Sequence, residues 1–363
     1  MAYGTVNADV IQSSVSGVSL GAGNATVFKN RIINGDMRID QRNAGASVSI
    51  STGTANYTVD RWSASASGGG VFTAQQTTTV PEGFTNSFGL TVTTVDSSIA
   101  TNDYYIIEQQ IEGLNCTDLG FGTANAKTVT VSFWVRSSLT GLAGGRLCNS
   151  ATNRSYVFTY TINSANTWEY KTATIAGDTS GTWLTSNGRG IGVLFNLTSG
   201  SGLTTSTIGS WVNGNYHGPS SQTVNFIGTN GATFYITGVQ LEVGSSATGF
   251  EYRDYGRELA MCQRYYQLIQ SATGAANTST NCVFTIQPFT VMRAGPTVGQ
   301  NGVLYISDFA NADVVQSSTN TTTYTSFNDM IIMGLGNFTG ISVLRPYFLR
   351  GINTNSITLS AEL

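Results

Sequence analysis

Thr128-Val-Thr-Val-Ser-Phe-Trp-Val-Arg136 alternates apolar and polar side chains one residue at a time. Successive side chains of a β-strand point to opposite faces, so the valines and Phe133 share one face, whereas Trp134 and Arg136 share the other. A strand with one apolar face buries that face against a second layer. The segment therefore predicts an antiparallel strand with one face in a core.

The same alternation recurs between about residues 46 and 250, in runs separated by turns rich in Gly, Asn, Ser and Asp. The runs are Ser87–Val95, Asp103–Ile111, Arg154–Ile162, Thr167–Ile175, Gly190–Leu197 and Ala232–Val243. Many short strands without intervening helical segments favour an antiparallel β-sandwich or jelly roll over a parallel α/β sheet. In the last run Gly238 shifts the phase of the alternation, which predicts a β-bulge.

Composition narrows the class of protein. The 363 residues are enough for two or three domains. Only 10% of the residues are charged, but 16 Tyr, 17 Phe and 5 Trp exclude a disordered chain. The formal net charge is −3 and the only lysines are Lys29, Lys127 and Lys171, so no basic surface is expected for nucleic acid or an anionic membrane.

No segment approaches the roughly 20 apolar residues of a membrane span, and the N-terminus lacks the order of a secretory signal. We therefore expect a chain made in a cytosol, without membrane insertion. Four cysteines lie far apart without a Cys-x-x-Cys pair, which predicts buried thiols rather than a zinc site or disulfides. They are Cys116, Cys148, Cys262 and Cys282.

A helix is predicted at Gly256–Ile269, where Leu259, Cys262, Tyr266 and Ile269 fall on one stripe and Asp254 precedes as a cap. We place a domain boundary here, so that residues 254–270 connect a sandwich at 30–253 to a small β-domain at 271–363. Ser271–Asn281, rich in small residues, is expected to be a loop. Strand-like runs follow at Cys282–Phe289, Gly302–Ser307, Asp329–Leu335, Ile341–Leu349 and Ile357–Leu363.

Both ends of the chain suggest partners. Residues 1–29 have little periodicity and too few apolar residues for a core, so we expect them to become ordered on a partner. The run Met330-Ile-Ile-Met333 is apolar on both faces, which suits burial by a neighbouring subunit.

Several segments together resemble tail-fibre and virion structural proteins of tailed phages. They are Met1-Ala-Tyr-Gly-Thr-Val-Asn-Ala-Asp-Val-Ile11, Lys29-Asn-Arg-Ile-Ile-Asn-Gly-Asp-Met-Arg-Ile-Asp-Gln-Arg-Asn43, Tyr57-Thr-Val-Asp-Arg-Trp62, Ile236-Thr-Gly-Val-Gln-Leu-Glu-Val-Gly244, Phe250-Glu-Tyr-Arg253, Glu258-Leu-Ala-Met-Cys-Gln-Arg-Tyr-Tyr266 and Met292-Arg-Ala-Gly-Pro-Thr-Val298. The resemblance covers residues 1 to about 300. It implies a carbohydrate-binding-module-like jelly roll at 30–253, attachment to a phage tail or baseplate through 1–29, a homotrimer, and a distal domain that meets the host surface.

A site for host polysaccharide would need flat aromatic faces flanked by polar side chains. Trp134 faces away from Val131 and Phe133, so it either lines a second apolar layer or lies exposed on a concave sheet. Trp211, Tyr216 and His217 lie in a segment rich in Gly, Asn and Ser, where side chains are often exposed.

In the last domain, Tyr324, Phe327 and Tyr347 combine aromatic rings with the cation Arg345, and these residues either bind glycan or form a subunit interface. Trp62, Trp168 and Trp183 follow strand patterns and are expected in the core.

Asn34-Gly35-Asp36 resembles the segment of carbohydrate-binding jelly rolls that helps to hold a structural calcium, with Asp36 as the available carboxylate. The alternative is an Asx turn that begins the first strand. No other cofactor is predicted.

No enzyme signature is present. His217 is the only histidine, no Gly-x-Ser-x-Gly occurs, and no pair of acids is marked as catalytic. The leading hypothesis is therefore a non-catalytic, receptor-binding phage appendage. A purely architectural virion protein that binds no glycan, and a polysaccharide depolymerase, are the alternatives.

Overall fold

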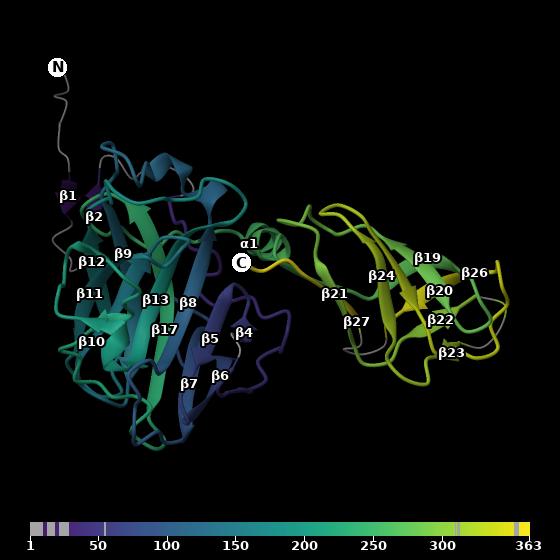
Figure 1. The fold of residues 1–363 in the computed structure, drawn as a ribbon, viewed down its shortest axis with the longest axis horizontal. Helices are drawn as coiled ribbons and strands as arrows, with labels where there is room; N and C mark the ends of the chain where they lie inside the picture. The colour runs from purple at the N-terminus through teal and green to yellow at the C-terminus, as the bar shows by residue number, and fades with distance from the viewer. Residues whose placement is uncertain are drawn as a thin grey trace, which may run out of the picture. The chain divides into compact units, whose positions relative to one another are not determined.

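A computed structural model describes residues 10–12, 19–21, 29–53, 56–308, 310, 313–351 and 356–363. The chain forms two compact units, Met1–Arg253 and Asp254–Glu362 (Figure 1). The predicted N-terminal arm lies outside the described residues, except for Lys29 and the paired strands β1 (Val10–Gln12) and β2 (Ser19–Gly21).

The first unit contains two antiparallel sheets. The seven-stranded sheet has the order β15 (Trp211–Asn213), β11 (Arg154–Ile162), β10 (Gly141–Cys148), β13 (Arg189–Ser199), β8 (Tyr104–Glu112), β5 (Trp62–Ala66) and β4 (Asn56–Val59). The six-stranded sheet has the order β12 (Glu169–Ile175), β9 (Val129–Ser137), β17 (Thr233–Val243), β7 (Ser87–Thr94), β6 (Val71–Thr77) and β3 (Val48–Ile50). Short elements complete the unit: the parallel pair β14 (Thr204–Thr205) and β16 (Gly218–Pro219), and the 3₁₀ turns η1 (Gly113–Asn115), η2 (Thr117–Leu119) and η3 (Ser201–Leu203).

One core joins the two sheets, as the alternation in β9 predicts. Phe133 of β9 is fully buried, and its ring lies 4.8 Å from that of Phe195 in β13 and 5.0 Å from that of Tyr160 in β11, both centroid to centroid. Trp62 is also fully buried, as expected. Burying a side chain such as Phe133 stabilises a fold by about 1.5–3 kcal/mol. The predicted all-β architecture, an antiparallel sandwich, is confirmed.

The bulge predicted at Gly238 is present in β17. The register with β9 shifts between Thr237 and Gln240, and Gly238 has φ +62°, a left-handed conformation that favours glycine. The bulge keeps Val239 and Leu241 in the core although the alternation changes phase.

The segments that carry the family resemblance tie the start of the first unit to its last strand. The Asn30 side chain donates to Val239 O over 3.1 Å and accepts from Leu241 N over 3.0 Å. Asn30 N donates to Glu251 Oε2 over 2.8 Å, and Trp62 Nε1 donates to Asn34 O over 3.0 Å. These polar side chains satisfy buried backbone groups, which is a structural role.

The second unit begins with α1 (Tyr255–Gln263), and the Asp254 side chain accepts from Arg257 N over 2.9 Å as the predicted N-cap. A three-stranded sheet has the order β18 (Tyr266–Ile269), β27 (Ser356–Ser360) and β21 (Thr297–Asn301). A seven-stranded sheet has the order β23 (Val314–Val315), β22 (Tyr305–Ser307), β26 (Pro346–Arg350), β19 (Ser271–Ala276), β20 (Cys282–Ile286), β25 (Ile331–Leu335) and β24 (Thr321–Ser326).

Two predictions for this unit are wrong. The helix ends at Gln263 rather than Ile269, because Tyr266–Ile269 pairs with β27 and an apolar stripe at helical spacing also suits a strand. Ser271–Asn281 is not simply a loop, because β19 occupies its first half between β20 and β26. A Cβ at Gly274 would lie 2.1 Å from Val283 O, so this position of β19 requires glycine.

All four cysteines are buried free thiols, as predicted.

Candidate functional site

The outer face of the six-stranded sheet is built by the polar half of the alternation in β9. Val131 and Phe133 enter the core, whereas Ser132, Trp134 and Arg136 point outward. The register places Trp134 opposite Tyr170 of the edge strand β12. Their rings lie 5.4 Å apart, centroid to centroid, so two aromatic side chains from adjacent strands form one surface.

A hollow of about 470 Å³ lies over these two rings. Three further aromatic side chains, Phe84, Phe250 and Tyr252, line it and contact one another, with centroids 5.0–5.6 Å apart. The phenol of Tyr252 donates to Gly83 O over 3.0 Å, which fixes the ring at the rim. The remaining lining residues are Glu82, Ser132, Gly238, Thr248 and Gly249.

Gly238 keeps the hollow open. A Cβ built at Gly238 would lie 2.7 Å from Cζ of Phe84, closer than real Cβ contacts, and a tight 3.1 Å from Cδ1 of Trp134. The glycine that forms the bulge therefore also leaves room between these two rings.

The hollow is nearly neutral. Among its ten lining residues only Glu82 carries a carboxylate, and Glu82 is exposed. The nearby Glu242 is buried and accepts from Gln240 Nε2, Thr248 N and Thr248 Oγ1, at 2.7, 2.8 and 2.7 Å. Burial raises the pKa of the Tyr170 phenol above its ordinary value. Flat rings beside hydroxyls can stack on an apolar face of a ligand and hydrogen-bond its polar groups.

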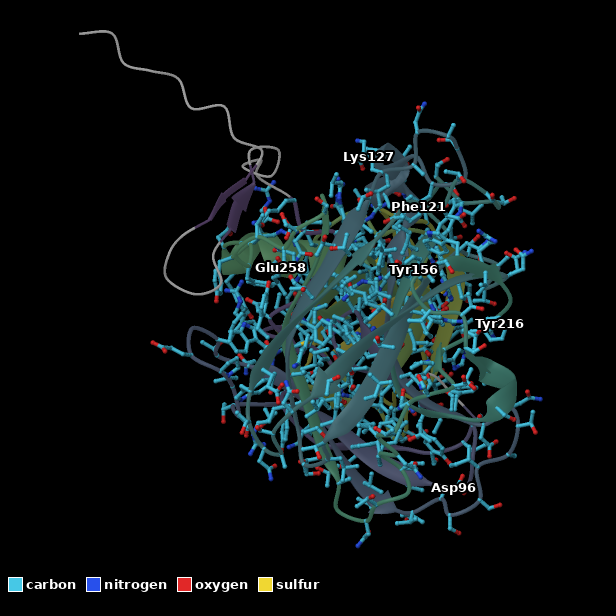
Figure 2. All side chains as sticks on the ribbon, turned by 90° about the vertical axis from the view of Figure 1, so that its left-hand side faces the viewer. Asp96, Phe121, Lys127, Tyr156, Tyr216 and Glu258 are labelled. Atoms are coloured by element: carbon cyan, nitrogen blue, oxygen red, sulfur yellow. The ribbon has the colours of Figure 1, made fainter. Side chains whose placement is uncertain are left out.

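Trp211, another predicted ligand residue, packs within an aromatic cluster of the first unit. Its indole Nε1 donates to Ala176 O over 2.7 Å, and its ring lies 5.2 Å from Trp183, 5.4 Å from Tyr156 and 5.8 Å from Phe121. Phe121 and Tyr156 are labelled in Figure 2. Trp183 packs against the core, as expected, and both tryptophans remain partly exposed.

The exposure expected for His217 is wrong. Its side chain is only 4% exposed, because its segment pairs with β14 and packs against β10 of the seven-stranded sheet, where Arg146 bonds the neighbouring Tyr216. Its ring packs on Tyr104 at 5.4 Å, and Nδ1 lies 3.4 Å from Ser199 Oγ. Tyr216, labelled in Figure 2, is half-buried, and its carbonyl accepts from Arg146 Nη1 over 3.3 Å.

The buried histidine predicts a pH dependence of stability. Burial, with the charges of Arg146 and Arg189, lowers the pKa of His217 to about 3, whereas an unfolded histidine titrates near pH 6.5. Between these values the unfolded chain binds a proton that the folded chain does not. Relative to a His217→Asn variant, the wild-type free energy of unfolding should fall by up to about 1.4 kcal/mol per pH unit below 6.5.

Urea unfolding of both proteins between pH 7.5 and 5 measures this difference. Burial raises the pKa of Asp60 to about 6, which increases the free energy of unfolding as the pH falls. This effect is the same in both proteins and cancels in the comparison. Above pH 7.5 the difference should be constant. If the free energies of unfolding of wild type and His217→Asn change in parallel with pH down to pH 5, His217 does not have a lowered pKa in the folded protein.

A second hollow, of about 370 Å³, lies beside this segment and is lined mainly by hydroxyl and amide groups. Its amides bond one another, since Asn196 Nδ2 donates to Gln222 Oε1 over 3.0 Å and Gln222 Nε2 donates to Leu197 O over 3.0 Å. The lining residues are Ile99, Asn196, Thr198, Ser199, Ser201, Thr204, Pro219, Ser220, Gln222, Val224 and Asn225.

The four candidates in the second unit do not form one surface. Tyr324 and Phe327 are 52% and 55% exposed at the edge strand β24, whereas Arg345 precedes β26, with three strands between β26 and β24. Arg345 pairs with Asp308 at 2.7 Å. Tyr347 is buried in the core of the unit, and its hydroxyl accepts from Ser342 N over 3.0 Å.

Asp36 is buried, and its carboxylate pairs with Arg38, although burial raises its pKa. The Asn34 side chain donates to Ile39 O and Asp60 O over 2.8 and 3.0 Å. No group of three or more Asp, Glu, His or Cys side chains within the described part of the chain is arranged for a metal ion. Calcium binding stays a prediction, and these contacts give it no support.

Of the aromatic residues that line the first hollow, only Trp134 is among the residues predicted from the sequence to bind a ligand. The place of Tyr170 in the hollow depends on the pairing of β12 with β9. Phe250 and Tyr252 belong to a segment that was noted only for its resemblance to phage proteins. Trp168 was expected in the core, but it is half-buried and its ring contacts Tyr235 at 6.4 Å, on the outward side of β17. The register of β12 could have indicated this.

Comparisons with known proteins give a weak likeness to sugar-binding sandwiches. No protein-family model matches the chain, and no curated protein is significantly similar in sequence. A family 11 carbohydrate-binding module from Clostridium thermocellum, solved with a β-1,3-1,4-mixed-linked tetrasaccharide, is 11% identical over 55% of this chain and 95% of its own, with a TM-score of 0.27. A putative sugar binding protein from Bacteroides thetaiotaomicron is 11% identical over 59% of this chain and 100% of its own, with a TM-score of 0.34.

A family 4 carbohydrate-binding module structure is 15% identical over 58% of this chain and 98% of its own, with a TM-score of 0.28. At these scores the likenesses carry no argument about the ligand, and none of them points to a phage tail fibre. Within the described residues, no helix has the length and hydropathy needed to cross a bilayer.

Proposed function

We propose that this chain binds glycan without catalysis, in the hollow on the outer face of the six-stranded sheet. The observation that carries the proposal is the set of five aromatic side chains around one nearly neutral hollow. They are Phe84, Trp134, Tyr170, Phe250 and Tyr252. Its volume lies within the roughly 300–1,000 Å³ typical of ligand pockets.

The chemistry of the hollow favours a sugar over other ligands. A pyranose ring offers an apolar CH face that stacks on an indole or phenol ring, and its hydroxyls suit the exposed carboxylate of Glu82 and the phenol of Tyr170. Glu82 alone among the lining residues could act as an acid, whereas a glycosidase requires two carboxyl groups across the bond. The proposed activity is therefore binding, and neither hydrolysis nor a cofactor has a part in it.

We further propose that the chain is a tail-fibre or receptor-binding appendage of a phage particle, attached to the tail through residues 1–29. The support for this role is the sequence resemblance alone. A homotrimer would combine weak single sites into avid binding of host polysaccharide.

The direct test applies the labelled full-length chain to an array of bacterial surface oligosaccharides. We expect retention of a subset of glycans, and no new reducing ends when the matching polysaccharide is incubated with the protein. Failure to retain any glycan would favour a purely architectural role, and new reducing ends would indicate a depolymerase. Mass photometry showing a stable monomer at micromolar concentration would contradict the trimer.

A further inference from the structure

A second group of side chains lies next to the hollow on the same outer face. Trp168 precedes β12, Arg136 is in β9 and Tyr235 is in β17, and the register places Tyr235 opposite Arg136. These three residues lie two positions along their strands from Trp134 and Tyr170. The separation is about 7 Å at the spacing of strand residues. An oligosaccharide with one ring on Trp134 can therefore place a neighbouring ring here.

Arg136 is held in a fixed position. Its Nε donates to Asn166 O over 2.9 Å, and its guanidinium lies over the Tyr235 ring, 5.1 Å from the centroid. The turn that supplies Asn166 O is itself fixed, because Glu169 accepts from Asn163 N and Ser164 N over 2.8 Å each. A guanidinium positioned in advance loses little entropy when it binds.

The charge of Arg136 is not neutralised within the described part of the chain, where no carboxylate pairs with it. Glu169, on the adjacent strand, is occupied by the turn and by Lys171 Nζ at 2.6 Å. With Nε used for the turn, the terminal nitrogens of Arg136 remain for a ligand. A planar guanidinium beside two aromatic rings suits a carboxylate carried on a sugar ring.

We propose that Arg136, Tyr235 and Trp168 form a second subsite that binds an acidic sugar, such as a uronic acid, beside a neutral sugar on Trp134. This inference rests on the proposed function, since both subsites belong to one sheet face. Because the whole chain has a net charge of −3, its overall field does not attract an acidic polysaccharide. A preference for acidic sugars must then come from Arg136 itself. A single substitution of Arg136 can therefore remove this preference.

The test compares uronate-containing oligosaccharides from bacterial surface polysaccharides with the same oligosaccharides after carboxyl reduction, using the full-length chain. Wild type should bind the acidic form about 10- to 100-fold more tightly, the range expected for a charge-assisted hydrogen-bonded pair. Arg136→Gln should lose this preference and bind both forms as wild type binds the reduced one. Lys127→Gln, which removes an exposed cation just before β9, about 30 Å from Arg136 at the spacing of strand residues, should keep it.

The outcomes separate the two claims. Equal wild-type affinity for acidic and reduced oligosaccharides, or a preference that survives in Arg136→Gln, would overturn the acidic subsite and leave the proposed function standing. Binding of neither form, with no glycan retained on the array, would overturn both. A preference abolished equally by Lys127→Gln would indicate nonspecific charge attraction and would also overturn the subsite.

Discussion

Replacing Trp134 with alanine is expected to weaken glycan binding by about 30- to 150-fold, corresponding to ~2–3 kcal/mol, the cost of truncating a central aromatic contact. Trp134 is half-buried on the outer face, and its ring meets Tyr170 at 5.4 Å on the floor of the hollow. Removal takes away the largest flat surface available to a sugar. Calorimetric titration of the full-length chain with the oligosaccharide selected on the array measures the effect.

The matched control is Tyr324→Ala, since Tyr324 is an exposed aromatic residue of the second unit. It should bind glycan like wild type, and both variants should keep the wild-type circular dichroism spectrum. If Tyr324→Ala abolishes binding and Trp134→Ala does not, the glycan site lies in the second unit and the present assignment is wrong.

The second large effect concerns stability. Phe133→Ala is expected to lower the free energy of unfolding of the first unit by about 3–5 kcal/mol, because it removes a fully buried ring and leaves a cavity between the sheets. Phe133 contacts Phe195 and Tyr160 of the opposite sheet, so little can move in to fill the space.

Guanidinium unfolding followed by tryptophan fluorescence measures this loss, since all five tryptophans lie in the first unit. Leu114→Ala, at a residue that is 56% exposed, is the control and should change stability by less than about 0.5 kcal/mol. A loss below about 1 kcal/mol for Phe133→Ala would mean that the two sheets do not share the core described above.

Periodicity predicted the strands whose outward residues are polar. β9, β11 and β17 are predicted because each carries its large apolar side chains on one face, and the phase shift at Gly238 identifies the bulge. β10 was missed because Gly144 and Gly145 carry no pattern. A Cβ at Gly144 would lie 2.3 Å from Cδ of Pro219, and one at Gly145 would lie 2.3 Å from Leu194 O. Such crowding comes from distant segments, which local alternation does not describe.

The candidate site was predictable only in part, for the same reason. The alternation in β9 places Trp134 on the outer face of its sheet. It does not show whether other segments of the chain cover that face. Phe84 and Phe250 reach the hollow from loops far apart in the sequence. Conversely, His217 lies in a segment of loop-like composition, yet that segment packs against β10 and the histidine is buried. Burial of such residues depends on tertiary packing rather than on their neighbours in sequence.

The most direct test of the central claim is a crystal structure of the full-length chain with the oligosaccharide that binds most tightly on the array. We expect one sugar ring to lie against Trp134 and Tyr170, within the hollow that Phe84, Phe250 and Tyr252 also line. A ligand bound in the hollow beside Asn196 and Gln222, or only on the second unit, with nothing against Trp134, would contradict it.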